Sequence, residues 1–146
     1  MQKRINIKDL EPKAFSAMLG MEAYIRSTSL PPLLLELIKV RASVLNGCAY
    51  CIDMHSQEAL KEGETTRRLF AVAAWTESPL FTEAERAALQ LTDEVTLVSD
   101  GGVSDETYDA VIKHFGENGT AQIIMQIIII NSWNRIAIST NQIFEG

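Results

Sequence analysis

Residues 31–63 read PPLLLELIKVRASVLNGCAYCIDMHSQEALKEG and predict two consecutive helices. The two prolines suit a helix start, because proline has a helical φ angle and needs no N–H partner in the first turn. The pattern breaks at Asn46-Gly47, and a second helix is expected from about Cys48 to Gly63, where glycine suits a left-handed C-terminal position. The only two cysteines of the chain therefore lie in the first turn of a helix.

The rest of the chain also has the pattern of helices separated by glycine and proline, with no apolar/polar alternation of period two that would indicate a strand. A Thr-x-x-Glu capping box at Thr82 opens one helix, and Gly116 ends another. We therefore predict an all-α protein with a single domain over residues 1–146. The other expected helices begin near Asp9 and Pro12, Thr65 or Thr66, Ser104, and Asn118 or Thr120.

The last predicted helix, over about residues 121–138, is apolar almost all round and needs cover from protein on several sides. Polar residues leave it fewer than the ~20 apolar residues that a bilayer crossing needs. A buried strand is the other alternative, but the chain offers no partner strand. We expect a core or subunit-interface helix, and hence a homo-oligomer. Its polar side chains should form an inter-helix or inter-subunit network: Asn131, Asn134 and Arg135.

Composition favours one globular protein that binds no nucleic acid. The chain has 146 residues, 47% of them hydrophobic, which is enough to bury a core. Its formal charge is −6 and no basic run exceeds Arg67-Arg68, so it lacks the positive surface of a nucleic-acid-binding protein. The basic N-terminus leads into Asp9 and Glu11 rather than into an apolar stretch. This predicts no secretory signal, no membrane attachment and a cytoplasmic location.

The side chains best suited to redox chemistry cluster in one segment, at Cys48, Cys51 and His55. Residues three and four apart share a helix face, so the two thiols and the imidazole should lie in one stripe. A cysteine pair at this spacing can close a disulfide between adjacent turns. In a reducing compartment two cysteines rarely form a structural disulfide, which favours a catalytic dithiol or a metal site.

A cysteine at this site needs its pKa lowered before it can act as a nucleophile, because a free thiol has a pKa near ~8.5. The N-terminal end of the helix would stabilise a thiolate on Cys48. His55 is closer to Cys51 and could accept its proton. Proximity to the imidazole therefore favours Cys51 as the attacking cysteine and Cys48 as the resolving one, whereas helix-end stabilisation favours the reverse.

Glu36 precedes Cys48 by twelve residues, and the pattern Glu-x11-Cys-x-x-Cys-x-x-x-His resembles the signature of AhpD alkylhydroperoxidases. The resemblance is to small single-domain AhpD-like proteins of the carboxymuconolactone decarboxylase superfamily. It is strongest over residues 33–75, and segment 131–135 is similar to the closing helix of such proteins. It implies an AhpD-like helical fold that assembles as trimers or hexamers.

The resemblance also implies a dithiol peroxidase in which Cys48 and Cys51 are the redox pair and Glu36 and His55 belong to a proton relay. One departure is Tyr50, because the best-known peroxidases of this family have histidine before the second cysteine, and tyrosine is a poor base at neutral pH. Tyr50 is expected to line the pocket or only to pack. The cycle would take a hydroperoxide substrate and an external dithiol reductant, thioredoxin-like or lipoyl, with no metal, flavin or haem.

Three other functions stay open from the sequence. A zinc site could use Cys48, Cys51, His55 and a fourth ligand, although structural zinc usually takes a second cysteine or histidine pair. Decarboxylation of a lactone is the reaction that gives the superfamily its name, and it does not need a dithiol. A redox-sensing oligomeric module would oxidise once, without turnover.

Overall fold

The computed structural model describes residues 2–143, and within this range every regular element is a helix, which confirms the predicted all-α class. The capping box at Thr82 is present, since its hydroxyl accepts from the Glu85 N–H at 3.2 Å and the Glu85 carboxylate accepts from the Thr82 N–H at 2.8 Å. The elements are α1 (Ile7–Leu10), α2 (Pro12–Arg26), α3 (Pro32–Asn46), α4 (Ala49–Lys61), α5 (Thr66–Ala71), the 3-10 helix η1 (Val72–Glu77), α6 (Glu83–Thr96) and α7 (Asp105–Ser139).

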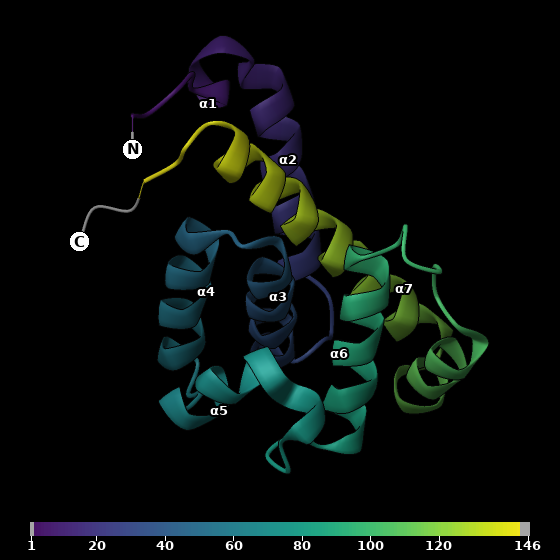
Figure 1. Ribbon diagram of the computed structural model, residues 1–146. Coiled ribbons are helices and arrows are strands. Elements are labelled where there is room, and N and C mark those ends of the chain that lie inside the picture. Colours follow the sequence, from purple (N-terminus) through teal and green to yellow (C-terminus); the bar gives the residue numbers. More distant parts are fainter. Residues whose placement is uncertain (1, 144–146) are drawn as a thin grey trace.

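Helix α3 is the centre of the molecule. It packs against α4, α6, α7 and η1, and Figure 1 shows it between α4 and α6, with the C-terminal part of α7 running diagonally across this group. Residues 34–40 of α3 are all buried. Seven consecutive positions cover every side of a helix, because one turn takes 3.6 residues. The two charged side chains in this stretch, Glu36 and Lys39, must therefore find partners inside the protein.

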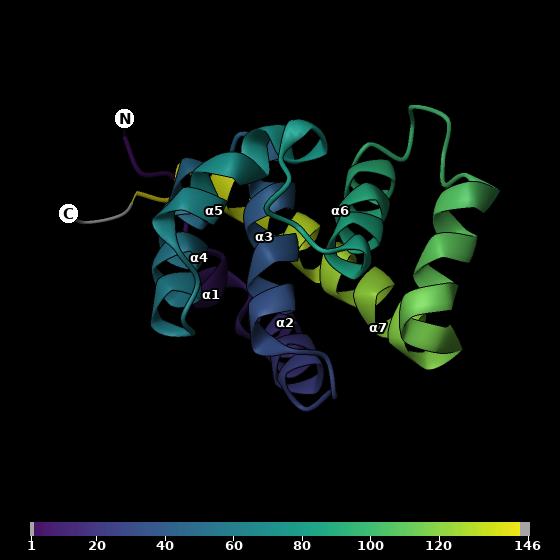
Figure 2. The same cartoon turned by 90° about the horizontal axis from the view of Figure 1, so that it is seen from below.

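Helix α7 is bent at Gly116, where φ is 69° and ψ is 178°. Figure 2 shows the two arms, a green N-terminal arm and a longer arm that runs back behind α6 and α3. This backbone conformation is open almost only to glycine. The predicted end of a helix at Gly116 is thus confirmed as a break between two helical arms.

Replacing Gly116 by alanine should lower the free energy of unfolding by about 1–3 kcal/mol, because the backbone there is strained for any residue with a Cβ. The added methyl would meet open space, so the cost is conformational and not steric. Gly20 is the matched control, since it lies inside α2 and also has open space around a Cβ. Gly20→Ala should instead stabilise by about 0.5–1 kcal/mol. Denaturant unfolding measures both, and equal stabilities of Gly116→Ala and wild type would contradict the prediction.

The apolar arm of α7 is covered more completely by its own chain than we expected. Four of its isoleucines are fully buried within a single chain, whereas Ile128 and Ile138 are exposed. The buried ones are Ile123, Ile127, Ile129 and Ile130. Assembly into a homo-oligomer stays a prediction. No helix within residues 2–143 is both long enough and apolar enough to cross a membrane.

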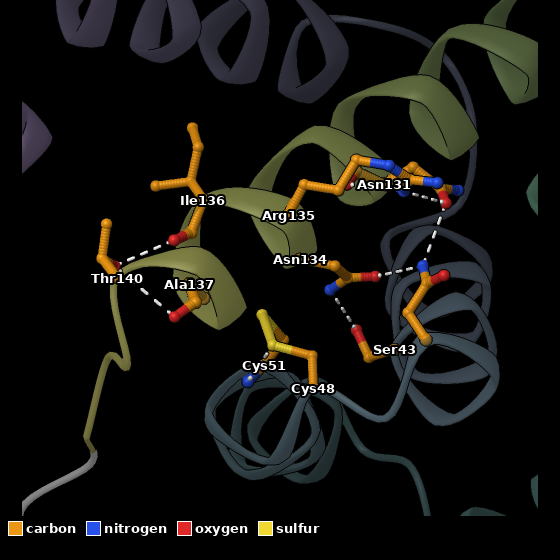
Figure 3. Close-up of a disulfide and its surroundings, with 10 residues drawn as sticks. Ser43, Cys48, Cys51, Asn131, Asn134, Arg135, Ile136, Ala137 and Thr140 are labelled. Carbon is orange, nitrogen blue, oxygen red and sulfur yellow. Dashed lines mark hydrogen bonds between the residues drawn. A yellow bond between two sulfur atoms is a disulfide. The ribbon is translucent and has the colours of Figure 1, made fainter. Parts of the chain in front are cut away.

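Two asparagines of this arm, Asn131 and Asn134, join α7 to α3. The side-chain amide of Asn46 donates to Oδ1 of Asn131 and to Oδ1 of Asn134, at 2.9 Å each. The Asn134 side-chain amide donates to the Ser43 hydroxyl at 3.0 Å (Figure 3). The Arg135 guanidinium donates to Asn131 Oδ1 at 2.8 Å. The expected inter-helix network is therefore confirmed for Asn131 and Asn134 within one chain, whereas Arg135 joins it only through Asn131 of its own helix.

Candidate functional site

A single glycine turn carries the chain from α3 into α4. Gly47 is left-handed (φ 66°, ψ 32°) and its N–H donates to the Val44 carbonyl at 3.2 Å. The next N–H, that of Cys48, donates to the Ser43 carbonyl at 3.0 Å. These are the two hydrogen bonds of a Schellman motif. The turn makes Cys48 the N-cap of α4, and its Sγ accepts from the Cys51 N–H at 3.4 Å.

Cys48 and Cys51 are joined by a disulfide that closes over the first turn of α4, with 5.3 Å between their Cα atoms. Figure 3 shows the pair facing Ala137 of α7, beside the Asn134 and Ser43 side chains. Both cysteines are at most 2% exposed, and Tyr50 and Ala137 pack against them. The structure therefore describes the oxidised form of the pair, enclosed by the start of α4 and the end of α7.

His55 of α4 and Glu36 of α3 meet next to this pair. His55 Nδ1 lies 3.2 Å from Glu36 Oε2, and the Lys39 ammonium donates to Glu36 Oε1 at 2.7 Å. All three side chains are buried, with residue exposures of 7%, 9% and 4% for His55, Glu36 and Lys39. Two helices thus supply a buried acid, base and cation in one connected chain of hydrogen bonds.

Burial raises the pKa of the Glu36 carboxyl, but the hydrogen bond from His55 and the positive charge of Lys39 outweigh it, so this pKa lies below its ordinary value. Glu36 is therefore ionised at neutral pH, and its carboxylate accepts a hydrogen bond from a proton on His55 Nδ1. A neutral imidazole protonated on Nδ1 has Nε2 as its proton acceptor. Nε2 is thus the nitrogen with which His55 can take a proton from another group.

Cys51 and His55 both line an open cavity of about 630 Å³, whose wall comes mainly from α1, α2, α4 and α7. Tyr50 lines it as well. Cys48 does not border this cavity but lines a second one of about 210 Å³, next to the C-terminal end of α7. The large cavity therefore offers a ligand access to the second cysteine of the pair together with the imidazole.

The structure adds residues to the site that sequence reasoning missed. Lys39 is one, and its signal was a lysine three residues after Glu36 within an otherwise apolar stretch. Phe15 and Trp133 form part of the cavity wall, with ring centroids 5.4 Å apart in an edge-to-face arrangement. No local pattern links these two rings, because they come from α2 and α7. Within residues 2–143 no three His, Cys, Asp or Glu side chains form a group that could hold a metal ion.

The fold and the site together define a class of small helical proteins in which a Cys-x-x-Cys disulfide at a helix N-terminus borders a cavity beside a buried Glu–His pair. Residues 12–94 match the carboxymuconolactone decarboxylase family, and the chain belongs to this family as an AhpD-like member. The matched range includes Glu36, both cysteines and His55.

The chain is similar over most of its length to other proteins and to solved structures. The chain is 40% identical over 139 residues to the uncharacterised protein YdfG of Bacillus subtilis, which covers 95% of both chains. It superposes with a TM-score of 0.96 and 36% identity, over 99% of both chains, on a protein of unknown function from Agrobacterium tumefaciens described as a candidate antioxidant defence protein AhpD. The debrominase Bmp8 shares the fold at 23% identity and a TM-score of 0.81, over 94% of this chain and 74% of the other.

Proposed function

We propose that this protein reduces hydroperoxides with the Cys48–Cys51 dithiol and that His55 and Glu36 relay the protons. The observation that carries the proposal is the position of Cys51 and His55 on one cavity wall, with His55 held by Glu36 at 3.2 Å. A thiol needs a base to become a nucleophile, and a base needs a group that fixes its tautomer. We assign His55 as that base and Glu36 as the group that fixes its tautomer, which favours Cys51 as the attacking cysteine.

In the proposed cycle, His55 accepts the Cys51 proton and the thiolate attacks the terminal oxygen of the hydroperoxide. The O–O bond breaks, Cys51 becomes a sulfenic acid, and the alkoxide leaves as an alcohol with the proton from His55. The Cys48 thiol then attacks the Cys51 sulfur, so that the disulfide forms and water leaves. Two electrons of the dithiol thereby reduce one peroxide to alcohol and water.

The disulfide returns to the dithiol by exchange with an external dithiol, which is itself oxidised to a disulfide. We propose a thioredoxin-like or lipoyl partner for this step, with no metal, flavin or haem as electron carrier. We also propose that the protein works as a trimer or hexamer, as the family resemblance implies.

The test follows thiols and peroxide together. Free thiols of the reduced protein are counted before and after one addition of cumene hydroperoxide, and dihydrolipoamide is then added while peroxide consumption is measured. We expect two thiols per chain to disappear, to return on reduction, and to support continued peroxide loss. The double variant Cys48→Ser/Cys51→Ser corrects for direct reaction between dithiol and peroxide. Unchanged thiols would refute the proposal, and a single oxidation without turnover would indicate the redox-sensing module instead.

A further inference from the structure

The large cavity carries positive charges that reduction of a small peroxide does not need. Lys3, Lys8 and Arg26 line it, against a single acid, Glu22. The whole chain has a formal charge of −6, so a surplus of cations at this one cavity runs against the charge of the protein. A local surplus of this kind attracts an anion.

The three cations are free to bind such an anion. All three are exposed, and within residues 2–143 none of them forms an ion pair or a side-chain hydrogen bond. The one acid, Glu22, accepts a hydrogen bond from the Trp133 indole N–H at 2.9 Å and forms no ion pair with these cations. The cations are exposed while Cys51 and His55 are buried. We therefore place the cations at the opening of the cavity, and Cys51 and His55 in its interior.

The remaining wall and the size of the cavity fit an apolar body. Phe15, Leu19, Met54 and Ile136 line it together with the ring of Trp133. The volume of about 630 Å³ lies in the range of roughly 300–1,000 Å³ typical of small-molecule sites. Hydrogen peroxide is only slightly larger than water, whose share of liquid volume is about 30 Å³. It would therefore leave most of this space unfilled.

We infer that the substrate is an organic hydroperoxide of a long-chain carboxylic acid. This inference rests on the proposed peroxidase function, and it names the class of substrate for that same site. The hydroperoxide group reaches Cys51, the hydrocarbon body packs against the aromatic and aliphatic wall, and the carboxylate lies among the cations at the opening. The chemistry is the cycle given above, with the hydroxy acid and water as products.

The test compares the hydroperoxide of linoleic acid with its methyl ester, which lacks the carboxylate charge but has the same hydrocarbon chain. Both are used below the concentration at which they aggregate, with dihydrolipoamide as reductant. We expect kcat/KM for the acid to exceed that for the ester about three- to tenfold, because exposed ion pairs contribute up to about 1 kcal/mol each. Added salt should reduce this ratio, since exposed charges are screened.

Two double variants connect the ratio to the cavity. Lys8→Gln/Arg26→Gln should lower the acid-to-ester ratio towards one, with Lys3 left in place. Arg67→Gln/Lys113→Gln is the matched control, because it changes the net charge by the same amount at exposed residues outside the cavity, and it should keep the wild-type ratio. Equal kcat/KM for acid and ester in the wild type, with both turned over, would overturn this inference and leave the peroxidase function standing. If acid, ester and cumene hydroperoxide were all left intact, the proposed function would fail and this inference with it.

Discussion

Cys51→Ser will fail to react with hydroperoxide at all, whereas Cys48→Ser will react once and stop with a sulfenic acid on Cys51. Both variants should lose turnover by a factor on the order of 10³ or more, because removal of a nucleophile leaves only the weak residual effects of the site. The difference between them follows from the cavities. Cys51 borders the large one together with His55, and Cys48 does not. We therefore expect only Cys51 to meet both the peroxide and the base.

Trapping of the sulfenic acid with dimedone, followed by mass spectrometry, distinguishes the two cysteines. We expect the label in Cys48→Ser treated with one equivalent of peroxide and none in Cys51→Ser. A persistent label on Cys48 in Cys51→Ser would reverse the assignment and would show that the helix N-terminus, not His55, activates the thiol. Far-UV circular dichroism of both variants serves as the control for folding.

Glu36→Gln will have the second large effect, a loss of about 3–5 kcal/mol in the free energy of unfolding. The substitution leaves the Lys39 ammonium buried without its carboxylate partner, and an uncompensated buried charge costs about this much. The double variant Glu36→Gln/Lys39→Met removes both charges and should recover most of the loss. If the single and double variants were equally unstable, the cost would lie in packing and not in the unpaired charge.

The stability difference between wild type and Glu36→Gln should depend on pH. The pKa of Glu36 in the folded protein lies below its ordinary value of 4.5, so its ionised form stabilises the fold above that pH. As pH falls through the folded pKa, the carboxyl is protonated in both states and this contribution is lost. The stability difference between wild type and Glu36→Gln should therefore shrink as pH falls below about 4.5, as measured by urea unfolding. A difference that stayed constant from about pH 6 to about pH 3 would contradict the prediction.

Much of the helix pattern was determined by the sequence itself. The Thr82 capping box, the glycine after Asn46 and the break at Gly116 all act through residues only a few positions away, so their signals are complete in a short stretch of chain. The stripe of Cys48, Cys51 and His55 is likewise a property of one helix. The selection of Glu36 was possible only through the family resemblance, because its partner His55 comes from the next helix.

The tertiary structure alone decided how these parts meet. It showed α3 to be the central helix, although the apolar arm of α7 had the stronger sequence signal, and it paired Lys39 with Glu36. The large cavity also lies between helices from both ends of the chain. One example is the hydrogen bond between Trp133 and Glu22, which are 111 residues apart. Local patterns fix helices because their hydrogen bonds are local. A cavity depends on which faces of distant helices pack together, and no single helix encodes that.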